Sequence, residues 1–143
     1  LQNVQTCFHD LIASGCVNGE LDLHRARHCA RYASRPMDIP IQTNVTDAAR
    51  LAKQPGNVLL DVREPYELAI CQIAGSLQIP MGNIPGRLAE IPRDQRILVL
   101  CHHGARSMRV TEWLRANGYA NASNIAGGIE AWAENIDPSL ARY

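Results

Sequence analysis

The stretch Arg96–Asn117, RILVLCHHGARSMRVTEWLRAN, determines how the chain folds. Four apolar, β-prone residues (97–100) end abruptly at Cys101, and a polar loop (102–106) follows. From Ser107 onward, apolar and charged residues recur at the spacing of a helix, and Gly118 is placed to end it. The stretch therefore predicts a buried strand, a short loop and a helix, with a thiol where the strand meets the loop.

This position has chemical consequences for Cys101. The free N–H groups of a first helical turn, together with the helix dipole, favour negative charge at that point. A thiolate is favoured over a thiol there, and Arg106 or a nearby protonated histidine acts in the same direction. The alternative is an incidental buried cysteine, since free cysteines are often part of a core. The polar loop behind the cysteine favours an activated nucleophile.

Three segments of the chain resemble the rhodanese (thiosulfate sulfurtransferase) family. Residues 101–107 have the form Cys-x-x-Gly-x-Arg-Ser, which is similar to the family's active-site loop. Residues 58–67, VLLDVREPYE, resemble its strand ending in Asp-Val-Arg, and residues 124–132, NIAGGIEAW, resemble its closing Gly-Gly-Ile-x-Ala-Trp segment. Each motif alone is weak, but the three occur in the expected order and cover about residues 38–143.

The resemblance implies a sulfurtransferase that needs no cofactor and no metal. Cys101, as a thiolate, would attack the outer sulfur of thiosulfate or another sulfane donor and become a persulfide. Cyanide, a thiol or a protein acceptor would then remove that sulfur. Loop N–H groups can stabilise the compact anion Cys-S-S⁻ as they would an oxyanion.

Roles for the remaining site residues follow from the residue types. Arg106 is expected to hold the donor sulfonate and to stabilise the persulfide, because its forked guanidinium matches an oxyanion. Gly104 is expected to allow a tight loop, and Ser107 to cap or open the helix. The other residues of the substrate-binding loop are His102, His103 and Ala105. The two histidines either add charge to the site or point into solvent.

Asp61 and Arg63 end a neighbouring strand at the same edge of the predicted sheet. We expect them to support the active loop through an ion pair or hydrogen bonds, not to take part in the chemistry. Cys71 is a second thiol that could resolve a persulfide. A small apolar residue filling the core is the favoured interpretation of Cys71.

The order of elements predicts an α/β fold. Strands are expected around residues 39–41, 58–62, 77–79, 97–100 and 122–125. Helices are expected from a cap at Thr46-Asp47 to about residue 54, from Pro65, over 83–90, over 107–117 and over 129–134. Alternating strands and helices of this length predict a rhodanese-like three-layer sandwich with a central, mainly parallel sheet. Ligands of such sheets bind beyond the carboxyl ends of the strands, where Cys101 lies.

Residues 1–37 are expected to form a helical N-terminal extension, and residues 38–143 the rhodanese-like domain. The extension could pack on the domain or form a homodimer with a second copy. His24 and His28 lie four residues apart and could share a helix face that binds a metal. No recognised ligand spacing supports that alternative, and we expect ordinary helix residues.

The composition of the chain bears on which partners it binds and in which cellular compartment it is found. The formal net charge is zero, which gives no indication of nucleic-acid or membrane-surface binding. No apolar run approaches the roughly 18 residues of a membrane span. Five cysteines, an odd number at irregular spacing, do not indicate a disulfide framework. A reducing cytoplasm is the expected location.

Two other functions compete with sulfur transfer. Cdc25-type cysteine phosphatases are similar in fold and also use a Cys-loop-Arg cradle, but with five residues between Cys and Arg. Here four residues separate Cys101 from Arg106, and no aspartate is evident as a general acid for a leaving alcohol. A non-enzymatic rhodanese module that binds or regulates a partner is the second alternative. Such modules usually lack the cysteine that this chain keeps.

Overall fold

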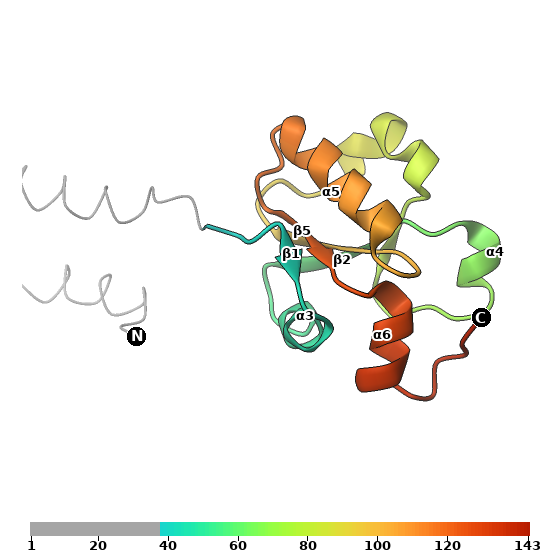
Figure 1. The fold of residues 1–143 in the computed structure, drawn as a ribbon. Helices are drawn as coiled ribbons and strands as arrows, with labels where there is room; N and C mark the ends of the chain where they lie inside the picture. The colour runs from blue at the N-terminus through green and yellow to red at the C-terminus, as the bar shows by residue number, and fades with distance from the viewer. Residues whose placement is uncertain (1–37) are drawn as a thin grey trace, which may run out of the picture. The chain divides into compact units, whose positions relative to one another are not determined.

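The computed structural model describes residues 38–143. They form a five-stranded sheet with helices on both faces (Figure 1). The predictions of a helical extension, a homodimer and a histidine metal site concern residues 1–37 and lie outside the described residues.

All strand pairs in the sheet are parallel. In chain order the strands are β1 (Gln42–Thr43), β2 (Asn57–Asp61), β3 (Leu77–Gln78), β4 (Arg96–Leu100) and β5 (Ala122–Ile125). Their order across the sheet is β1-β5-β4-β2-β3. The predicted α/β fold with a central, mainly parallel sheet is confirmed, although the first strand begins at Gln42, three residues later than expected.

Strand β4 shows why a continuous apolar run suits the centre of this sheet. Ile97 and Val99 pack into one hydrophobic cluster, and Leu98 and Leu100 pack into another. Successive side chains of a strand point to opposite faces, so both faces must be covered if every residue is apolar. All four residues are 0% exposed.

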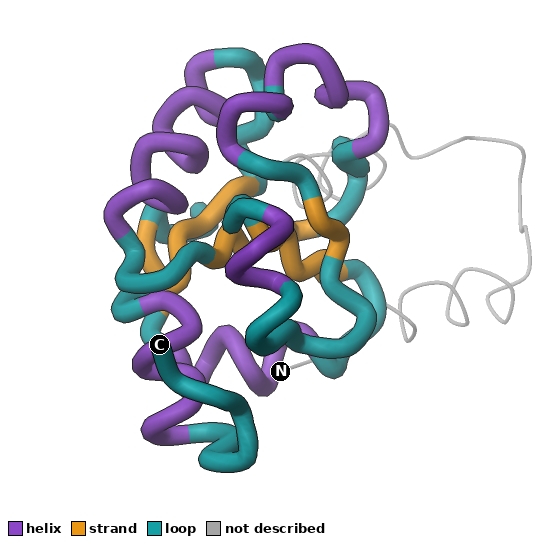
Figure 2. Tube along the Cα trace, turned by 90° about the vertical axis from the view of Figure 1, so that its right-hand side faces the viewer, coloured by secondary structure: helices purple, strands orange, loops and turns teal. Residues whose placement is uncertain are grey.

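Helices cover the two faces and complete the three layers (Figures 1 and 2). One face is covered by α5 (Ala105–Ala116) and by two 3₁₀ helices, η1 (Met81–Asn83) and η2 (Pro85–Glu90). The other is covered by α3 (Val45–Ala52) and α6 (Gly128–Asn135). The short helix α4 (Pro65–Leu68) follows β2 and begins at Pro65 as predicted.

Two local predictions were wrong. The helix expected over residues 83–90 is replaced by η1 and η2, because Arg87 leaves helical geometry at φ −116° and ψ 19° and interrupts the helical hydrogen-bond pattern. The cap of α3 is not Thr46-Asp47. Asn44 caps it, and its side-chain oxygen accepts a 2.8 Å hydrogen bond from the backbone N–H of Asp47.

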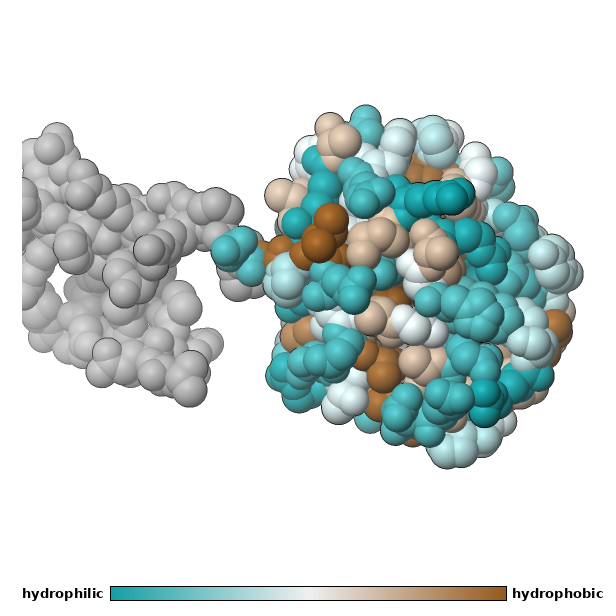
Figure 3. Space-filling view, in the orientation of Figure 1, coloured by the Kyte–Doolittle hydropathy of each residue, from teal (hydrophilic) through white to brown (hydrophobic). Residues whose placement is uncertain are grey.

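The surface of the described residues is mostly hydrophilic on the face that Figure 3 shows, with hydrophobic residues in small groups. Among residues 38–143, five large hydrophobic side chains are exposed: Ile41, Tyr66, Ile70, Trp113 and Tyr143. Within residues 38–143, no helix is long and apolar enough to cross a membrane.

Candidate active site

Cys101 directly follows β4 at the carboxyl edge of the sheet and is only 1% exposed. Its Sγ accepts a hydrogen bond from the backbone N–H of Gly104 at 3.1 Å and another from the Ser107 hydroxyl at 3.2 Å. Two donors aimed at one sulfur stabilise negative charge on it. One of these donors is a backbone N–H of the loop, as predicted, and the other is the Ser107 side-chain hydroxyl.

The turn between Cys101 and α5 depends on Gly104. Its φ is +102°, a left-handed conformation that glycine adopts without steric cost. A side chain at this position would also come within 3.2 Å of the Gly127 nitrogen. The expectation that Gly104 allows a tight loop is confirmed.

Ser107 does not cap or open α5, contrary to the sequence prediction. The helix begins two residues earlier, at Ala105, because Gly104 occupies the N-cap position with its left-handed backbone. Ser107 is therefore inside the first turn and 0% exposed. Its hydroxyl points at Cys101 Sγ and at the amide oxygen of Asn124, which lies 2.6 Å away.

Arg106 forms a two-point ion pair with Glu67 of α4. Its Nη1 and Nη2 atoms donate to the two carboxylate oxygens at 2.7 and 2.6 Å. The carboxylate also accepts hydrogen bonds from the Glu64 backbone N–H and from the Tyr143 hydroxyl. These hydrogen bonds, with Arg106 contributing most, lower the pKa of Glu67 to about 2, while the same pair raises the pKa of Arg106.

The Glu67–Arg106 pair predicts acid sensitivity. The Glu67 carboxyl titrates near 4.5 without these contacts and near 2 in the folded protein. The unfolded chain therefore takes up the proton first, and the free energy of unfolding falls as the pH drops from about 4.5 to about 2. We expect this group to account for about 2 kcal/mol. That is less than the full pKa difference implies, because the Arg106 side chain is 33% exposed.

Chemical denaturation between pH 2 and pH 7 measures this effect. Glu67→Gln should be less stable than the wild type at pH 7, and the two should converge near pH 2. Glu112→Gln, on the exposed face of α5, is the control and should follow the wild-type curve. Parallel curves for the wild type and Glu67→Gln would contradict the assignment.

A buried ion pair lies behind Glu67. Arg63 contacts Asp61 through Nε–Oδ1 at 2.9 Å and Nη2–Oδ2 at 2.6 Å, and both side chains are 0% exposed. Arg63 also donates to the backbone oxygen of Cys71 and to the Tyr143 hydroxyl, which in turn donates to Glu67. The predicted Asp61–Arg63 ion pair is confirmed, and Tyr143 links it to the carboxylate that holds Arg106.

Cys71 and Cys101 belong to different hydrophobic clusters. Cys71 is 8% exposed and packs with residues of α3 and α6, with its Sγ 3.8 Å from Arg63 Nη1. Cys101 packs with the cluster beneath α5. The favoured interpretation of Cys71 as a core residue agrees with this position.

The two loop histidines stack on each other, with ring centroids 4.0 Å apart. His102 also packs against Tyr143 at 4.3 Å, and its Nε2 lies 3.6 Å from a carboxylate oxygen of Glu130. His103 is exposed. His102 is thus held between the Tyr143 ring and the Glu130 carboxylate at the rim of the loop.

The Gly127-Gly128 turn lies against the start of the loop 101–107. The backbone N–H groups of Ile129 and Glu130 donate to the carbonyl oxygens of Cys101 and His102 at 2.9 and 3.2 Å. A side chain on Gly128 would collide with those same two carbonyl oxygens. The glycine therefore permits the contact that positions the backbone of the candidate nucleophile.

Gly128→Ala is expected to destabilise the protein by about 3 kcal/mol or more. The added methyl group overlaps backbone atoms that cannot move without shifting the loop, and the φ of +59° adds strain. Thermal unfolding measures the effect. Gly86→Ala is the matched control, because open space surrounds that glycine, and it should change stability little. Equal melting temperatures for the two variants would contradict the close contact.

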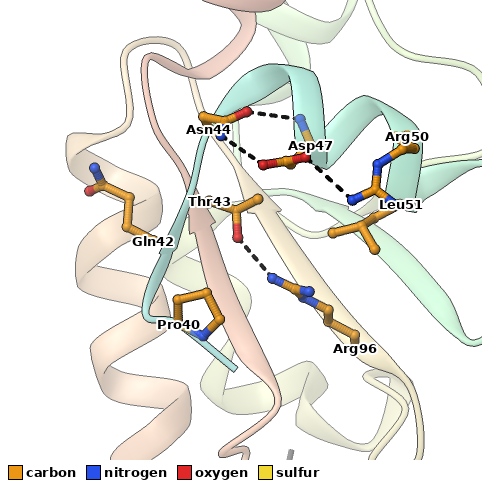
Figure 4. A pocket seen from close by; sticks show the side chains of 8 residues that line it. All are labelled: Pro40, Gln42, Thr43, Asn44, Asp47, Arg50, Leu51 and Arg96. Carbon is orange, nitrogen blue, oxygen red and sulfur yellow. Dashed lines mark hydrogen bonds and ion pairs between the residues drawn. The ribbon is translucent and has the colours of Figure 1, made fainter. Parts of the chain in front are cut away.

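A pocket of about 250 Å³ lies elsewhere, along β1 and α3 (Figure 4). Arg96, which lines it, donates to the Thr43 hydroxyl at 2.9 Å, and Asp47 pairs with Arg50 at its rim. Arg96 begins β4, whereas Cys101 follows its last residue. None of the pocket's lining residues belongs to the loop 101–107, so this pocket is not the candidate active site.

Comparison with known proteins agrees with the fold described above. The family model of the rhodanese-like domain matches residues 44–135. This chain belongs to the rhodanese-like domain family, as the three sequence motifs predicted.

Relatives and solved structures agree with this assignment. A sulfurtransferase of Allochromatium vinosum is 41% identical over 92 residues, which cover 64% of this chain and 86% of that protein. The adenylyltransferase and sulfurtransferase MOCS3 of Arabidopsis thaliana is 33% identical, over 65% of this chain but only 24% of its own length. A rhodanese-related protein of Thermoplasma volcanium is 35% identical, with a TM-score of 0.61 over 66% of this chain and 92% of that one.

Sequence reasoning missed three residues that contact the site: Glu67, Asn124 and Tyr143. Glu67 carries a usable signal, because it lies three residues after Glu64 and forms a capping box with it at the start of α4. Asn124 and Tyr143 are far from the loop in sequence, and no local pattern marks them as partners of Ser107 and Glu67.

Proposed function

We propose that the protein transfers a sulfane sulfur through a persulfide on Cys101. With thiosulfate as donor, the Cys101 thiolate attacks the outer sulfur, an S–S bond forms, and sulfite leaves with the electron pair of the broken bond. Cyanide then attacks the outer sulfur of Cys-S-S⁻, thiocyanate leaves, and the thiolate is restored. A persulfide donor and a thiol acceptor would react in the same two steps, without any cofactor or metal.

The observation that carries this proposal is the pair of hydrogen bonds that converge on Cys101 Sγ. The Gly104 N–H and the Ser107 hydroxyl lie within hydrogen-bond distance of the sulfur and can donate to the thiolate that attacks the sulfur donor. Because Cys101 is 1% exposed, a donor must present a single terminal sulfur to reach it. Thiosulfate and persulfides both have that shape.

Arg106 is placed to attract an anionic donor. Two of its N–H groups are bound to Glu67, and a guanidinium has five, so N–H groups remain for the sulfonate oxygens. Glu67 therefore fixes the orientation of Arg106 and also reduces the net positive charge that a donor encounters.

Arg106→Lys is expected to lower kcat/KM for thiosulfate by about 10- to 100-fold. A lysine ammonium cannot form the two-point pair with Glu67 or present a fork to a sulfonate. Steady-state kinetics with varied thiosulfate measures the loss. The control is Arg109→Lys on the exposed face of the same helix, which should retain wild-type kinetics. An Arg106→Lys enzyme with unchanged kcat/KM would remove Arg106 from the donor site.

Delivery to a protein acceptor is the second form of this function. The name of the MOCS3 relative gives that protein two activities, adenylyltransferase and sulfurtransferase. The region that matches this chain is 24% of that protein's length. A sulfur-transfer domain that acts together with another activity suits a specific protein acceptor better than free cyanide. We infer that cyanide replaces such an acceptor in the laboratory, and a reducing cytoplasm is the expected setting.

The experiment that tests the proposed function is formation of thiocyanate from thiosulfate and cyanide. A persulfide intermediate predicts ping-pong kinetics, with parallel lines in double-reciprocal plots. Absence of thiocyanate, with turnover of p-nitrophenyl phosphate instead, would support the phosphatase alternative. Absence of both activities would support a binding module.

A further inference from the structure

Asn124 is the buried partner of the serine that contacts Cys101. It lies in β5, which pairs with β4 at the register Val99–Asn124. Its side-chain oxygen is 2.6 Å from the Ser107 hydroxyl, which in turn is 3.2 Å from Cys101 Sγ. Asn124, Ser107 and Cys101 are 2%, 0% and 1% exposed. The three side chains thus form a hydrogen-bonded chain that is shielded from water.

This hydrogen-bonded chain contains one serine hydroxyl proton and two atoms that can accept it. A serine hydroxyl donates a single hydrogen bond, so it serves either Cys101 Sγ or the Asn124 oxygen at any moment. When Cys101 is a thiol, its S–H can donate to Ser107, and Ser107 donates to Asn124. When Cys101 is a thiolate, the sulfur has no proton and needs that of Ser107.

The arrangement with a Cys101 thiolate requires a change in the hydrogen bond between Ser107 and Asn124. If the hydroxyl turns to the sulfur, two oxygens 2.6 Å apart would face each other with no proton between them. A side-chain amide relieves this contact by turning over, because its NH₂ group then donates to the Ser107 oxygen. A carboxylate could only accept, and an apolar side chain could do neither.

We propose that Asn124 is a positioning residue that directs the Ser107 hydroxyl toward Cys101 and turns over when the sulfur gains its charge. This inference rests on the proposed function, since it assigns Asn124 to the activation of the same thiolate. Asn124 touches neither a donor nor an acceptor and acts only through Ser107.

A set of variants separates this role from a merely structural one. Asn124→Asp keeps the size of the side chain but accepts hydrogen bonds only, so it holds the Ser107 proton away from the sulfur. Asn124→Leu has similar size and does not compete for that proton. Each is made alone and together with Ser107→Ala. The neighbouring charged groups Arg106, Glu67, His102 and Glu130 are the same in every protein of the set.

The measurement is the pH dependence of Cys101 alkylation by iodoacetamide, with peptide mass spectrometry to separate Cys101 from the other thiols. Asn124→Asp should shift the pH midpoint upward by about one unit, which slows alkylation about tenfold below the midpoint. Asn124→Leu should shift it much less. In the Ser107→Ala background, the Asn124→Asp shift should shrink by at least half. A shift of equal size with and without Ser107 would overturn the proposal.

A second measurement needs no Asn124 variant and applies if Asn124→Asp fails to fold. The side-chain NH₂ resonances of Asn124 in the wild-type protein should change with the same pH midpoint as Cys101 alkylation, and should stop doing so in Ser107→Ala. The amide of Asn121, which donates to Arg93 and Gln95 carbonyls, is the internal control. Asn124 NH₂ resonances that do not change with pH would contradict the proposal that this amide turns over.

These readouts also distinguish the two proposals. Alkylation requires no sulfur donor, so coupling between Asn124 and Cys101 without thiocyanate formation would remove the sulfur-transfer proposal alone. Sulfur transfer without that coupling would remove only the role of Asn124.

Discussion

Replacement of Cys101 by serine is expected to lower the rate of sulfur transfer by at least about 10³-fold. A serine hydroxyl stays protonated at neutral pH and cannot form the S–S bond on which the proposed reaction depends. The fold should survive, because serine is close to cysteine in size and its oxygen can also accept the Gly104 N–H bond. Thiocyanate formation and circular dichroism measure the two effects.

Cys71→Ser is the matched control for this experiment. Cys71 is the other cysteine among residues 38–143, and it packs in a different hydrophobic cluster from Cys101. Its replacement should leave sulfur transfer near the wild-type rate. Loss of transfer in Cys71→Ser, together with activity in Cys101→Ser, would identify Cys71 as the nucleophile and contradict the assignment of Cys101.

The largest effect on stability is expected from Arg63→Ala, which should lower the free energy of unfolding by about 3–5 kcal/mol. Truncation leaves the Asp61 carboxylate 0% exposed without its charged partner. It also removes donors from the Cys71 carbonyl and the Tyr143 hydroxyl. Urea denaturation measures the loss.

Two further variants test the cause of that loss. Asp61→Asn added to Arg63→Ala should recover part of the stability, because the uncompensated charge is gone. Arg50→Ala, which breaks a solvent-exposed pair with Asp47, should change stability little. An Arg63→Ala protein within about 1 kcal/mol of the wild type would show that the buried pair contributes far less than its geometry suggests.

The part of the fold that local sequence determines was predicted well. The apolar run 97–100, the glycine at 104 and the helical pattern beyond it act over neighbouring residues, and the structure has β4, the turn and α5 at those places. Predictions failed where one residue altered the local geometry. Arg87 leaves helical geometry inside the helix that the spacing of Ile84 and Leu88 indicated, and the left-handed Gly104 starts α5 before Ser107.

The candidate site was predicted only as far as its loop. Glu67 meets Arg106 across 39 residues, and Asn124 meets Ser107 across 17. These contacts depend on strand order and register, which place the carboxyl ends of β2, β4 and β5 at one edge of the sheet. Hydrophobic periodicity predicts that strands exist, but it does not fix which side chains from separate strands face each other.

The most direct test of the central claim is the intact mass of the protein after incubation with thiosulfate and removal of the excess. A persulfide intermediate predicts a gain of one sulfur atom, located on Cys101 by peptide mapping, absent in Cys101→Ser and lost when cyanide is added. A protein that gains no sulfur from thiosulfate or from a low-molecular-weight persulfide would contradict the persulfide mechanism. A stable sulfur that cyanide does not remove would also contradict it.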